Sequence, residues 1–230
     1  LKAGDTNSIF DVGCGTGSWL RAARAIFEDK GSRFGIDPNL TEGESFKDGV
    51  EIRKQDILSM SFHRQFEIVI CVEVAEHIEE SKADRLVSQL CDASYNLIIF
   101  SAAIPGQGGE GHVNEQWPDY WAKKFAENGF RLKYDPRPNL WNNKKIRPWY
   151  RQNLLVFQSM PNMGRDTLDD HWTPNRLVHP DLWRGLRAKL LSEGIVPSQP
   201  SDGTDPALAH FQTQTTPAAT QPKNVFLALP

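Results

Sequence analysis

The chain has 230 residues, of which 39% are hydrophobic and 24% charged, proportions that suit one globular α/β domain with additional segments. The formal net charge of −3 provides no general electrostatic attraction to DNA, to long RNA or to an anionic membrane. Three cysteines and the lack of an apolar run of about 18 residues indicate a cytoplasmic protein with no disulfide framework and no membrane span.

The first predicted strand ends in a glycine-rich turn. Residues 9–12 form a short apolar run that is typical of a buried parallel strand, and Gly-Cys-Gly-Thr-Gly follows at 13–17. Over residues 19–27 the apolar side chains recur at helical spacing. Glycines let a ligand approach the backbone closely, and a helix N-terminus offers free N–H groups to that ligand. The order strand, glycine turn, helix therefore predicts a nucleotide-type site at the C-terminal end of the first strand.

The spacing of these glycines differs from that of the known motifs that bind dinucleotides or nucleotide phosphates. Gly13, Gly15 and Gly17 are evenly spaced, unlike the G-x-G-x-x-G of dinucleotide-binding proteins, and no G-K-[ST] sequence follows to cradle phosphates. Asp11 precedes them. An acid at this place would repel a pyrophosphate, but it suits a ligand with an ammonium group.

This D-x-G-x-G-x-G sequence resembles the first motif of class I S-adenosylmethionine-dependent methyltransferases. The resemblance extends over about residues 8–159 and implies an α/β, Rossmann-like fold. Its seven-stranded, mostly parallel sheet would have the order 3-2-1-4-5-7-6, with helices on both faces. It also implies that Asp37 holds the ribose hydroxyls and that Asp56 lies near the adenine amino group. The residues expected to bind S-adenosylmethionine are Asp11, Gly13, Cys14, Gly15, Gly17, Asp37, Pro38, Asp56, Ile57 and Cys71.

Apolar patterns predict the other elements of this domain, which we place at residues 1–160. The polar segment 38–48 is expected to be a loop with a short helix. Strands are predicted over 33–37, 50–54, 66–72 and 96–103, helices over 80–93 and 117–128, a glycine-rich loop over 105–116, and a closing antiparallel hairpin from 130–134 and 154–158.

Beyond residue 160 the pattern weakens. A C-terminal extension at 161–193 is expected to contain a helix over 181–191, and 194–223 is rich in Pro, Ser, Thr and Gln, which is typical of a flexible linker. The apolar run 224–230 is interpreted as the possible start of a following domain. Together with a first residue other than methionine, this indicates a part of a larger multidomain protein.

The stretch Glu-Val-Ala-Glu-His at 73–77 follows the fourth predicted strand, where a methyl acceptor would lie. If it forms one helical turn, Glu73, Glu76 and His77 share a face, and His112 from the later glycine-rich loop would complete a site for a divalent ion. The stretch resembles one in ubiquinone-pathway O-methyltransferases and one that binds magnesium in plant-type small-RNA 2′-O-methyltransferases. The alternative is that Glu76 caps a helix and His77 only packs or orients the substrate.

Two hypotheses for activation of the acceptor stay open. In the first, His112 alone is the base, because a histidine with a pKa near ~6.5 accepts a proton at neutral pH. In the second, Glu73, Glu76, His77 and His112 hold Mg²⁺ or Mn²⁺, which lowers the pKa of the acceptor hydroxyl. The predicted catalytic residues are His112, His77 and Glu76. A third interpretation treats His112 as a solvated loop residue.

The acceptor is predicted from two further segments. Trp141, Trp149 and Tyr150 stand near amide and guanidinium side chains, which suits a sugar, although these rings could simply pack the last hairpin. Residues 101–121 and 147–157 resemble methyltransferases of bacterial and viral glycan clusters, which implies an O-methyltransferase acting on a sugar or glycan hydroxyl and releasing S-adenosylhomocysteine. The alternatives are methylation of an RNA 3′-end ribose and a non-catalytic cofactor-binding domain in a glycan-assembly protein.

Overall fold

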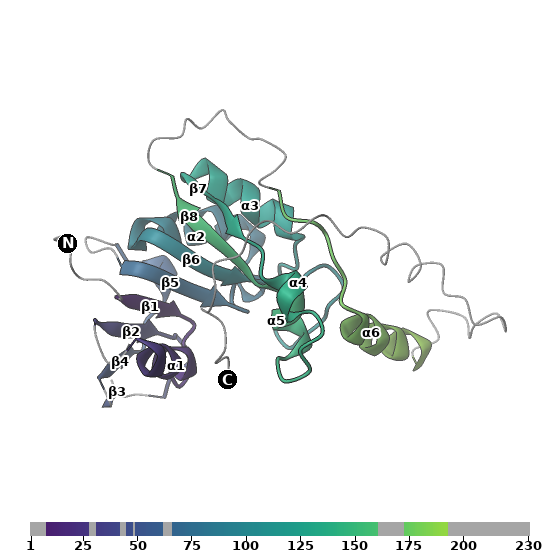
Figure 1. Ribbon diagram of the computed structural model, residues 1–230, viewed down its shortest axis with the longest axis horizontal. Helices are drawn as coiled ribbons and strands as arrows, with labels where there is room; N and C mark the ends of the chain where they lie inside the picture. Colours follow the sequence, from purple (N-terminus) through teal and green to yellow (C-terminus); the bar gives the residue numbers. More distant parts are fainter. Residues whose placement is uncertain are drawn as a thin grey trace.

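The structure is a computed structural model that describes residues 8–27, 31–41, 45–47, 49–61, 66–160 and 173–192. A sheet of order β3-β4-β2-β1-β5-β6-β8-β7 runs through its centre (Figure 1). The strands are β1 (Ile9–Val12), β2 (Arg33–Ile36), β3 (Ser45–Lys47), β4 (Val50–Arg53), β5 (Phe66–Val72), β6 (Ser94–Ser101), β7 (Phe130–Tyr134) and β8 (Leu155–Ser159). The helices are α1 (Ser18–Ile26), α2 (Ala83–Ala93), α3 (Pro118–Glu127), α4 (Arg137–Leu140), α5 (Pro148–Asn153) and α6 (Pro180–Ser192), with short 3₁₀ turns at Ile57–Ser59, Ala75–His77 and Glu80–Lys82.

The strand directions confirm the predicted sheet. β4, β2, β1, β5 and β6 run parallel to one another, whereas β3 is antiparallel to β4 and β8 is antiparallel both to β6 and to β7. Without β3, the order in the sheet is 3-2-1-4-5-7-6 in strand number along the chain. The carboxyl ends of β1, β2, β4, β5 and β6 therefore meet at one edge, which is where open α/β sheets bind their ligands.

The additional strand β3 corrects the expectation of a loop with a short helix over 38–48. Ser45–Lys47 pairs antiparallel with β4, and Lys47 lies opposite Val50. The sequence between them is Asp-Gly, and Gly49 has a φ of 72°. An Asp-Gly pair is a preferred two-residue hairpin connection because it tolerates positive φ. The Asp-Gly pair does not stand out as a hairpin turn in the sequence because the whole segment around it is polar.

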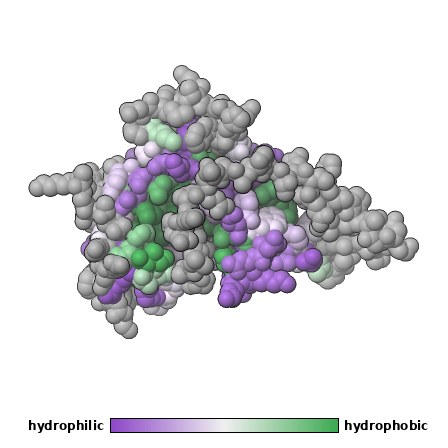
Figure 2. Space-filling model, viewed as in Figure 1, coloured by the Kyte–Doolittle hydropathy of each residue, from purple (hydrophilic) through white to green (hydrophobic). Residues whose placement is uncertain are grey.

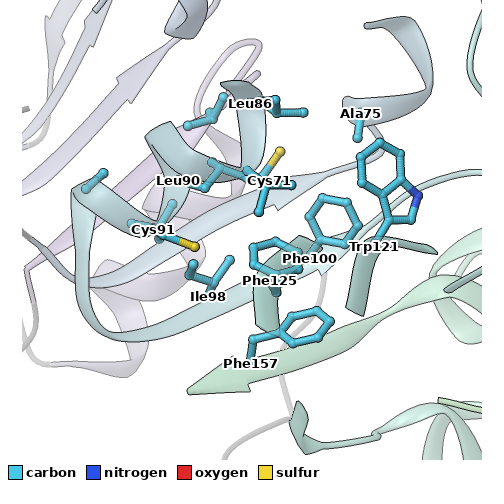
Figure 3. Packing of buried hydrophobic residues seen from close by; sticks show 14 of the residues in the cluster. Cys71, Ala75, Leu86, Leu90, Cys91, Ile98, Phe100, Trp121, Phe125 and Phe157 are labelled. Carbon is cyan, nitrogen blue, oxygen red and sulfur yellow. The ribbon is translucent and has the colours of Figure 1, made fainter. Parts of the chain in front are cut away.

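Apolar side chains cover both faces of the sheet, as expected for helices on both sides. Successive strand residues point to opposite faces, so Phe10 packs in the large cluster under α2 and α3, while its neighbour Ile9 packs in the smaller cluster under α1. Figure 3 shows the large cluster, in which the Phe125 and Phe157 rings stack with centroids 4.3 Å apart. Two buried faces hold the central strands in place and thereby fix the edge where the site lies.

The C-terminal part of the described chain carries one helix beyond the sheet. The helix predicted over 181–191 is present as α6, which lies apart from the sheet beside α5 (Figure 1). Residues 161–172 and 193–230 lie outside the described residues, and with them the predicted linker and final strand. Within the described ranges, no helix combines the length and the apolar character needed to cross a membrane.

Candidate active site

The glycine turn after β1 leaves open space beside the backbone. A side-chain carbon added at Gly15 would meet no atom within 4 Å, whereas one at Gly13 would lie 2.4 Å from Val74. Both residues have positive φ, of 49° and 72°, as does Gly17 at the start of α1. Gly13 is therefore required by packing, and Gly15 faces a space that a ligand can occupy.

Asp11 lies buried beneath this turn, with 2% of its surface exposed. Its Oδ2 atom has no hydrogen-bond partner among the described residues. Burial, and secondarily the charge of Asp37, raise the pKa of the Asp11 carboxyl to about 8. A buried carboxyl without a partner is costly unless a cation or donor reaches it. These residues fit a cofactor that brings an ammonium group, as S-adenosylmethionine does.

The two predicted acids on the neighbouring strands lie at the same edge. Asp37 follows β2 and accepts hydrogen bonds from the backbone N–H of Gly15 at 3.0 Å and of Asn39 at 2.8 Å. Asp56 follows β4 and accepts from the N–H of Leu58 at 2.9 Å, which caps the first 3₁₀ turn. The carboxylate of Asp37 thus ties the glycine turn to β2, while Asp56 stays exposed.

The other predicted cofactor residues differ in exposure. Pro38 is exposed, and Ile57 is buried at the start of the 3₁₀ turn. Cys14 packs against Gly35, and Cys71 lies fully buried in the large cluster (Figure 3). Burial raises the pKa of both thiols, that of Cys14 to about 12. Neither sulfur faces open space, so only the backbone of these cysteines is placed to approach a cofactor.

Glu73 stands apart from the helical turn that the sequence suggested. The turn contains Ala75–His77 alone and is 3₁₀, whereas Glu73 has a φ of 56°, in the left-handed region. Its carboxylate turns toward other donors: it accepts from Ser101 Oγ at 2.7 Å and from Asn153 Nδ2 at 3.2 Å, with Gln107 Nε2 at 3.5 Å. The expectation of one face shared by Glu73, Glu76 and His77 is therefore wrong.

Glu76 is fully buried at the end of β5. Neither of its carboxyl oxygens has a hydrogen-bond partner of normal geometry among the described residues. Burial, and secondarily the charge of Glu73, raise the pKa of Glu76 well above its usual range. Glu76 is thus a second buried acid, and it lies next to the carboxyl of Glu73, whose charge disfavours the ionised form of Glu76.

Two histidines stand beside Glu76 with their rings perpendicular and 5.0 Å apart between centroids. His77 Nδ1 lies 3.2 Å from the carbonyl of Gly111, and His112 Nδ1 lies 2.8 Å from the carboxylate of Glu115. A carbonyl and a carboxylate only accept, so Nδ1 carries the proton in both rings. The Nε2 atoms are left as the unprotonated nitrogens, available to accept a proton or to bind a metal.

Glu115 is a residue that the sequence analysis did not single out. Besides His112, it accepts from the backbone N–H of Gly106 at 2.8 Å and of Gly108 at 2.7 Å. One carboxylate therefore shapes the glycine-rich loop and orients the histidine in it. A signal was present in the sequence, since an acid three residues after a histidine in a loop suits this arrangement.

Glu76, His77 and His112 each offer a ligand atom, and these atoms lie within 4.8 Å of one another. A histidine that binds a metal ordinarily donates its other ring N–H to a carboxylate or a backbone carbonyl, as both histidines do here. The three residues fit a divalent ion, and their two nitrogens favour Mn²⁺ or Zn²⁺ over Mg²⁺. Glu73, predicted as a fourth ligand, is absent from this group.

Of the three aromatic residues predicted to form a sugar platform, Trp149 and Tyr150 meet edge-on with their centroids 5.9 Å apart, whereas Trp141 has other neighbours. Trp141 packs on His179, with centroids 4.5 Å apart, and Trp149 contacts the guanidinium of Arg147. Tyr150 meets Trp19 of α1 edge-on at 5.5 Å, beside the glycine turn. Tyr150 thus reaches the cofactor side of the site, whereas Trp141 belongs to the packing of the C-terminal segment.

A buried polar network behind Glu73 was not expected. Asn153 donates to Glu73 and also, at 3.0 Å, to Gln107 Oε1, which accepts from Gln152 Nε2 at 3.0 Å as well. Gln152 Oε1 in turn accepts from the backbone N–H of His179 at 2.6 Å. The network connects the segment before α6 to the carboxylate at the end of β5, across more than 100 residues of sequence.

Comparison with known proteins agrees with this arrangement. Residues 9–94, from β1 to the first residue of β6, match the family model of a methyltransferase domain. No curated protein matches the chain. An O-methyltransferase from a trans-AT PKS multienzyme of Brevibacillus brevis, solved with S-adenosyl-L-homocysteine, is 13% identical, with a TM-score of 0.51 over 86% of this chain and 81% of that one. Magnesium protoporphyrin IX methyltransferase from Synechocystis PCC 6803 is 18% identical, with a TM-score of 0.49 over 66% of this chain and 73% of that one.

The fold is that of the class I methyltransferases. The O-methyltransferase of Brevibacillus brevis supports this for the fold alone, because its identity to the chain is low. The family model, which covers residues 9–94, adds support for a methyltransferase domain. The site lies where the fold binds its ligands, at the carboxyl ends of the parallel strands.

Proposed function

We propose that the chain is an S-adenosylmethionine-dependent O-methyltransferase that acts on a hydroxyl of a sugar or glycan. The observation that carries the proposal is the oriented pair of His112 and Glu115 at the edge of the sheet that also holds the glycine turn. A general base at this edge would serve to deprotonate a weakly acidic group, such as a hydroxyl.

The cofactor side consists of the turn at Gly13–Gly17 with Asp11, Asp37 and Asp56. When bound, S-adenosylmethionine supplies an electrophilic methyl group on its sulfonium. Asp11 offers an unpartnered carboxyl to the ammonium group, and Asp37 and Asp56 stand on the next two strands for the ribose and adenine. The open space at Gly15 leaves room for the cofactor against the backbone.

The acceptor side provides the base. Glu115 fixes His112 with Nδ1 protonated, so Nε2 accepts the proton of the acceptor hydroxyl. The carboxylate also stabilises the imidazolium that forms, as an acid does in any triad of this kind. Much of the rate is expected to come from alignment of the oxygen with the methyl carbon and sulfur, which rigid strand ends favour.

A divalent ion at Glu76, His77 and His112 is the second hypothesis for activation. The ion would bind a ring nitrogen of His112, so His112 would be a metal ligand and not the free base of the first hypothesis. When bound, the ion supplies a positive charge that lowers the pKa of a hydroxyl. Treatment with EDTA separates the hypotheses. Loss of activity with recovery in Mn²⁺ or Mg²⁺ supports the ion, and full activity in EDTA supports His112 as a simple base.

An RNA 3′-terminal ribose is a second candidate acceptor because of one exposed surface. Lys144, Lys145 and Arg147 are exposed in the segment between α4 and α5, where Figure 2 shows a hydrophilic area. These three cations would attract phosphates, but the chain as a whole is acidic, which favours the smaller sugar acceptor.

The proposal is tested with two measurements. Calorimetry with S-adenosylhomocysteine should give micromolar binding, and no binding would overturn the proposal and leave a domain without this cofactor. Mass spectrometry should then detect a product 14 Da heavier with at least one member of a panel of sugars, nucleotide sugars and glycan ends. An RNA oligonucleotide with a free 3′ end belongs in the same panel, and exclusive methylation of it would favour the second candidate.

A further inference from the structure

A cavity of about 200 Å³ lies between the loop after β6 and the C-terminal segment. Residues 104–107 of the loop, Trp117 before α3 and Gln152 of α5 form one side. Val178, with Leu182 and Trp183 of α6, forms the other. These segments are far apart in the sequence, and the hydrogen bond from His179 to Gln152 holds them together.

The lining of the cavity selects an uncharged ligand. Its described lining contains two tryptophan rings, aliphatic side chains and, as its polar side chains, only the amides of Gln107 and Gln152. No Asp, Glu, Lys or Arg is among these lining residues, so a phosphate or carboxylate would enter at a high desolvation cost. Aromatic walls with a few fixed polar groups are typical of sites that orient a small ring.

The ring of Trp117 packs against an exposed ion pair. The guanidinium of Arg176 lies over its ring at 5.6 Å and makes two hydrogen bonds, of 2.8 and 2.7 Å, to the carboxylate of Asp119. Trp183 is 36% exposed, which is unusual for so large an apolar side chain. The wall at Trp117 is therefore supported by an ion pair, and the wall at Trp183 includes a partly exposed aromatic ring.

Two residues that line the cavity also contact acids of the acceptor side. Gln107 lines it and also approaches the carboxylate of Glu73. Gly106 lines it and donates its N–H to Glu115, the residue that orients His112. A ring in the cavity would therefore be separated from Glu73 by Gln107, and from His112 by Gly106 and Glu115.

We propose that this cavity binds the sugar ring of the acceptor, with the ring packed between Trp117 and Trp183. The inference rests on the proposed sugar specificity, and it assigns that specificity to a surface other than Trp141, Trp149 and Tyr150. A volume of about 200 Å³ is below the ~300–1,000 Å³ of sites that hold a whole drug-sized ligand. The cavity thus takes one neutral ring, while the rest of a glycan or a nucleotide extends outside it.

The test uses ligand-observed NMR on the full chain, with and without S-adenosylhomocysteine. The probes are the methyl glycosides of glucose, galactose, mannose and rhamnose, with phenol as an aromatic ring of similar size. At least one glycoside should receive saturation at its ring protons. Its dissociation constant should rise at least tenfold in Trp183→Ala and in Val178→Trp, the first of which removes a wall and the second of which fills the space.

Controls keep the outcomes distinct. Tyr95→Ala changes an exposed aromatic residue at the opposite end of β6 and should bind the glycoside as the unaltered chain does. Affinity for S-adenosylhomocysteine should be unchanged in all variants, which also verifies folding. Equal glycoside binding in both cavity variants, or binding of phenol but of no glycoside, would overturn the inference. Failure of the unaltered chain to bind S-adenosylhomocysteine would instead overturn the proposed function.

Discussion

The cofactor side and the acceptor side of the site are built in different ways. On the cofactor side, one segment of about ten residues supplies the strand end, the turn and the helix start. The shape of this side depends mainly on the backbone conformation of its glycines. On the acceptor side, side chains from four separate segments meet: the end of β5, the loop after β6, α5 and the residues before α6. The first side is local in sequence, whereas the second depends on the completed fold.

Each side nevertheless contains one buried acid with a carboxyl oxygen that lacks a hydrogen-bond partner of normal geometry among the described residues, although the carboxyl of Glu76 also lies next to that of Glu73. Asp11 lies beneath the glycine turn, and Glu76 lies beside the two histidines. Burial is the first cause of the raised pKa in both cases. A cation brought by a ligand would stabilise the charged form of each of these acids. The comparison therefore predicts an ammonium group at Asp11 and, under the second hypothesis of acceptor activation, a metal ion at Glu76.

The largest expected effect is on the acceptor side. His112→Ala should lower methyl transfer by about 10²–10⁴-fold, as is typical for loss of a general base, with cofactor binding intact. The measurements are the steady-state rate and calorimetry with S-adenosylhomocysteine. Val113→Ala, at an exposed neighbouring position, is the matched control and should retain activity. Full activity in His112→Ala would contradict both hypotheses of acceptor activation.

The same contrast explains what the sequence predicts. The sequence predicts the strands and the glycine turn because each depends on a short pattern, whereas the strand order and the places of Asp37 and Asp56 are predicted from the resemblance to class I methyltransferases. The contacts of Glu73 were predicted wrongly because a positive φ, which is rare outside glycine, turns the chain before the expected helix begins. Asn153 and His179 contact the site only through residues that are distant in the chain, so no local pattern indicates them.

On the cofactor side, Gly15→Arg should weaken binding of S-adenosylhomocysteine by at least about 100-fold, because the side chain fills the open space beside the turn. Gly129→Arg is a matched control: Gly129 also has positive φ and open space, but it lies at the end of α3. Both variants carry the same backbone strain, so their thermal midpoints should be similar. Equal affinity in the two variants would show that Gly15 does not face the cofactor.

A smaller effect is expected from Glu115→Gln. The amide keeps the size of the side chain but no longer holds His112 as a charged acceptor, and losses of this kind are typically about 10–100-fold. The Michaelis constant for the cofactor should not change, since the glycine turn is untouched. The pH profile is the decisive measurement, because a structural role alone would lower the rate without shifting the pH at which it rises. An unshifted profile would assign Glu115 to loop structure only.

The smallest expected effect concerns stability and sharpens the comparison most directly. A carboxyl group whose pKa is higher in the folded state than in the unfolded state binds more protons when folded, so stability falls as pH rises between the two values. For Asp11 this interval runs from its ordinary value near 4 to about 8. The thermal midpoint of the ligand-free chain should therefore decrease from pH 5 to pH 8, with a shallower decrease in Asp11→Asn and in Glu76→Gln.

Ligands should separate the contributions of Asp11 and Glu76 to the pH dependence of stability, because each ligand cation stabilises the charged form of the acid on its own side. S-adenosylhomocysteine, which retains the ammonium group, should flatten the pH dependence of the unaltered chain as far as Asp11→Asn does, and should change little more in that variant. Mn²⁺ should act in the same way on the contribution of Glu76 and have no such effect in Glu76→Gln. The measurement is thermal unfolding at pH 5, 6, 7 and 8 with each ligand. If Mn²⁺ leaves the slope unchanged while S-adenosylhomocysteine flattens it, Glu76 is a neutral buried acid, and His112 acts as the base without a metal.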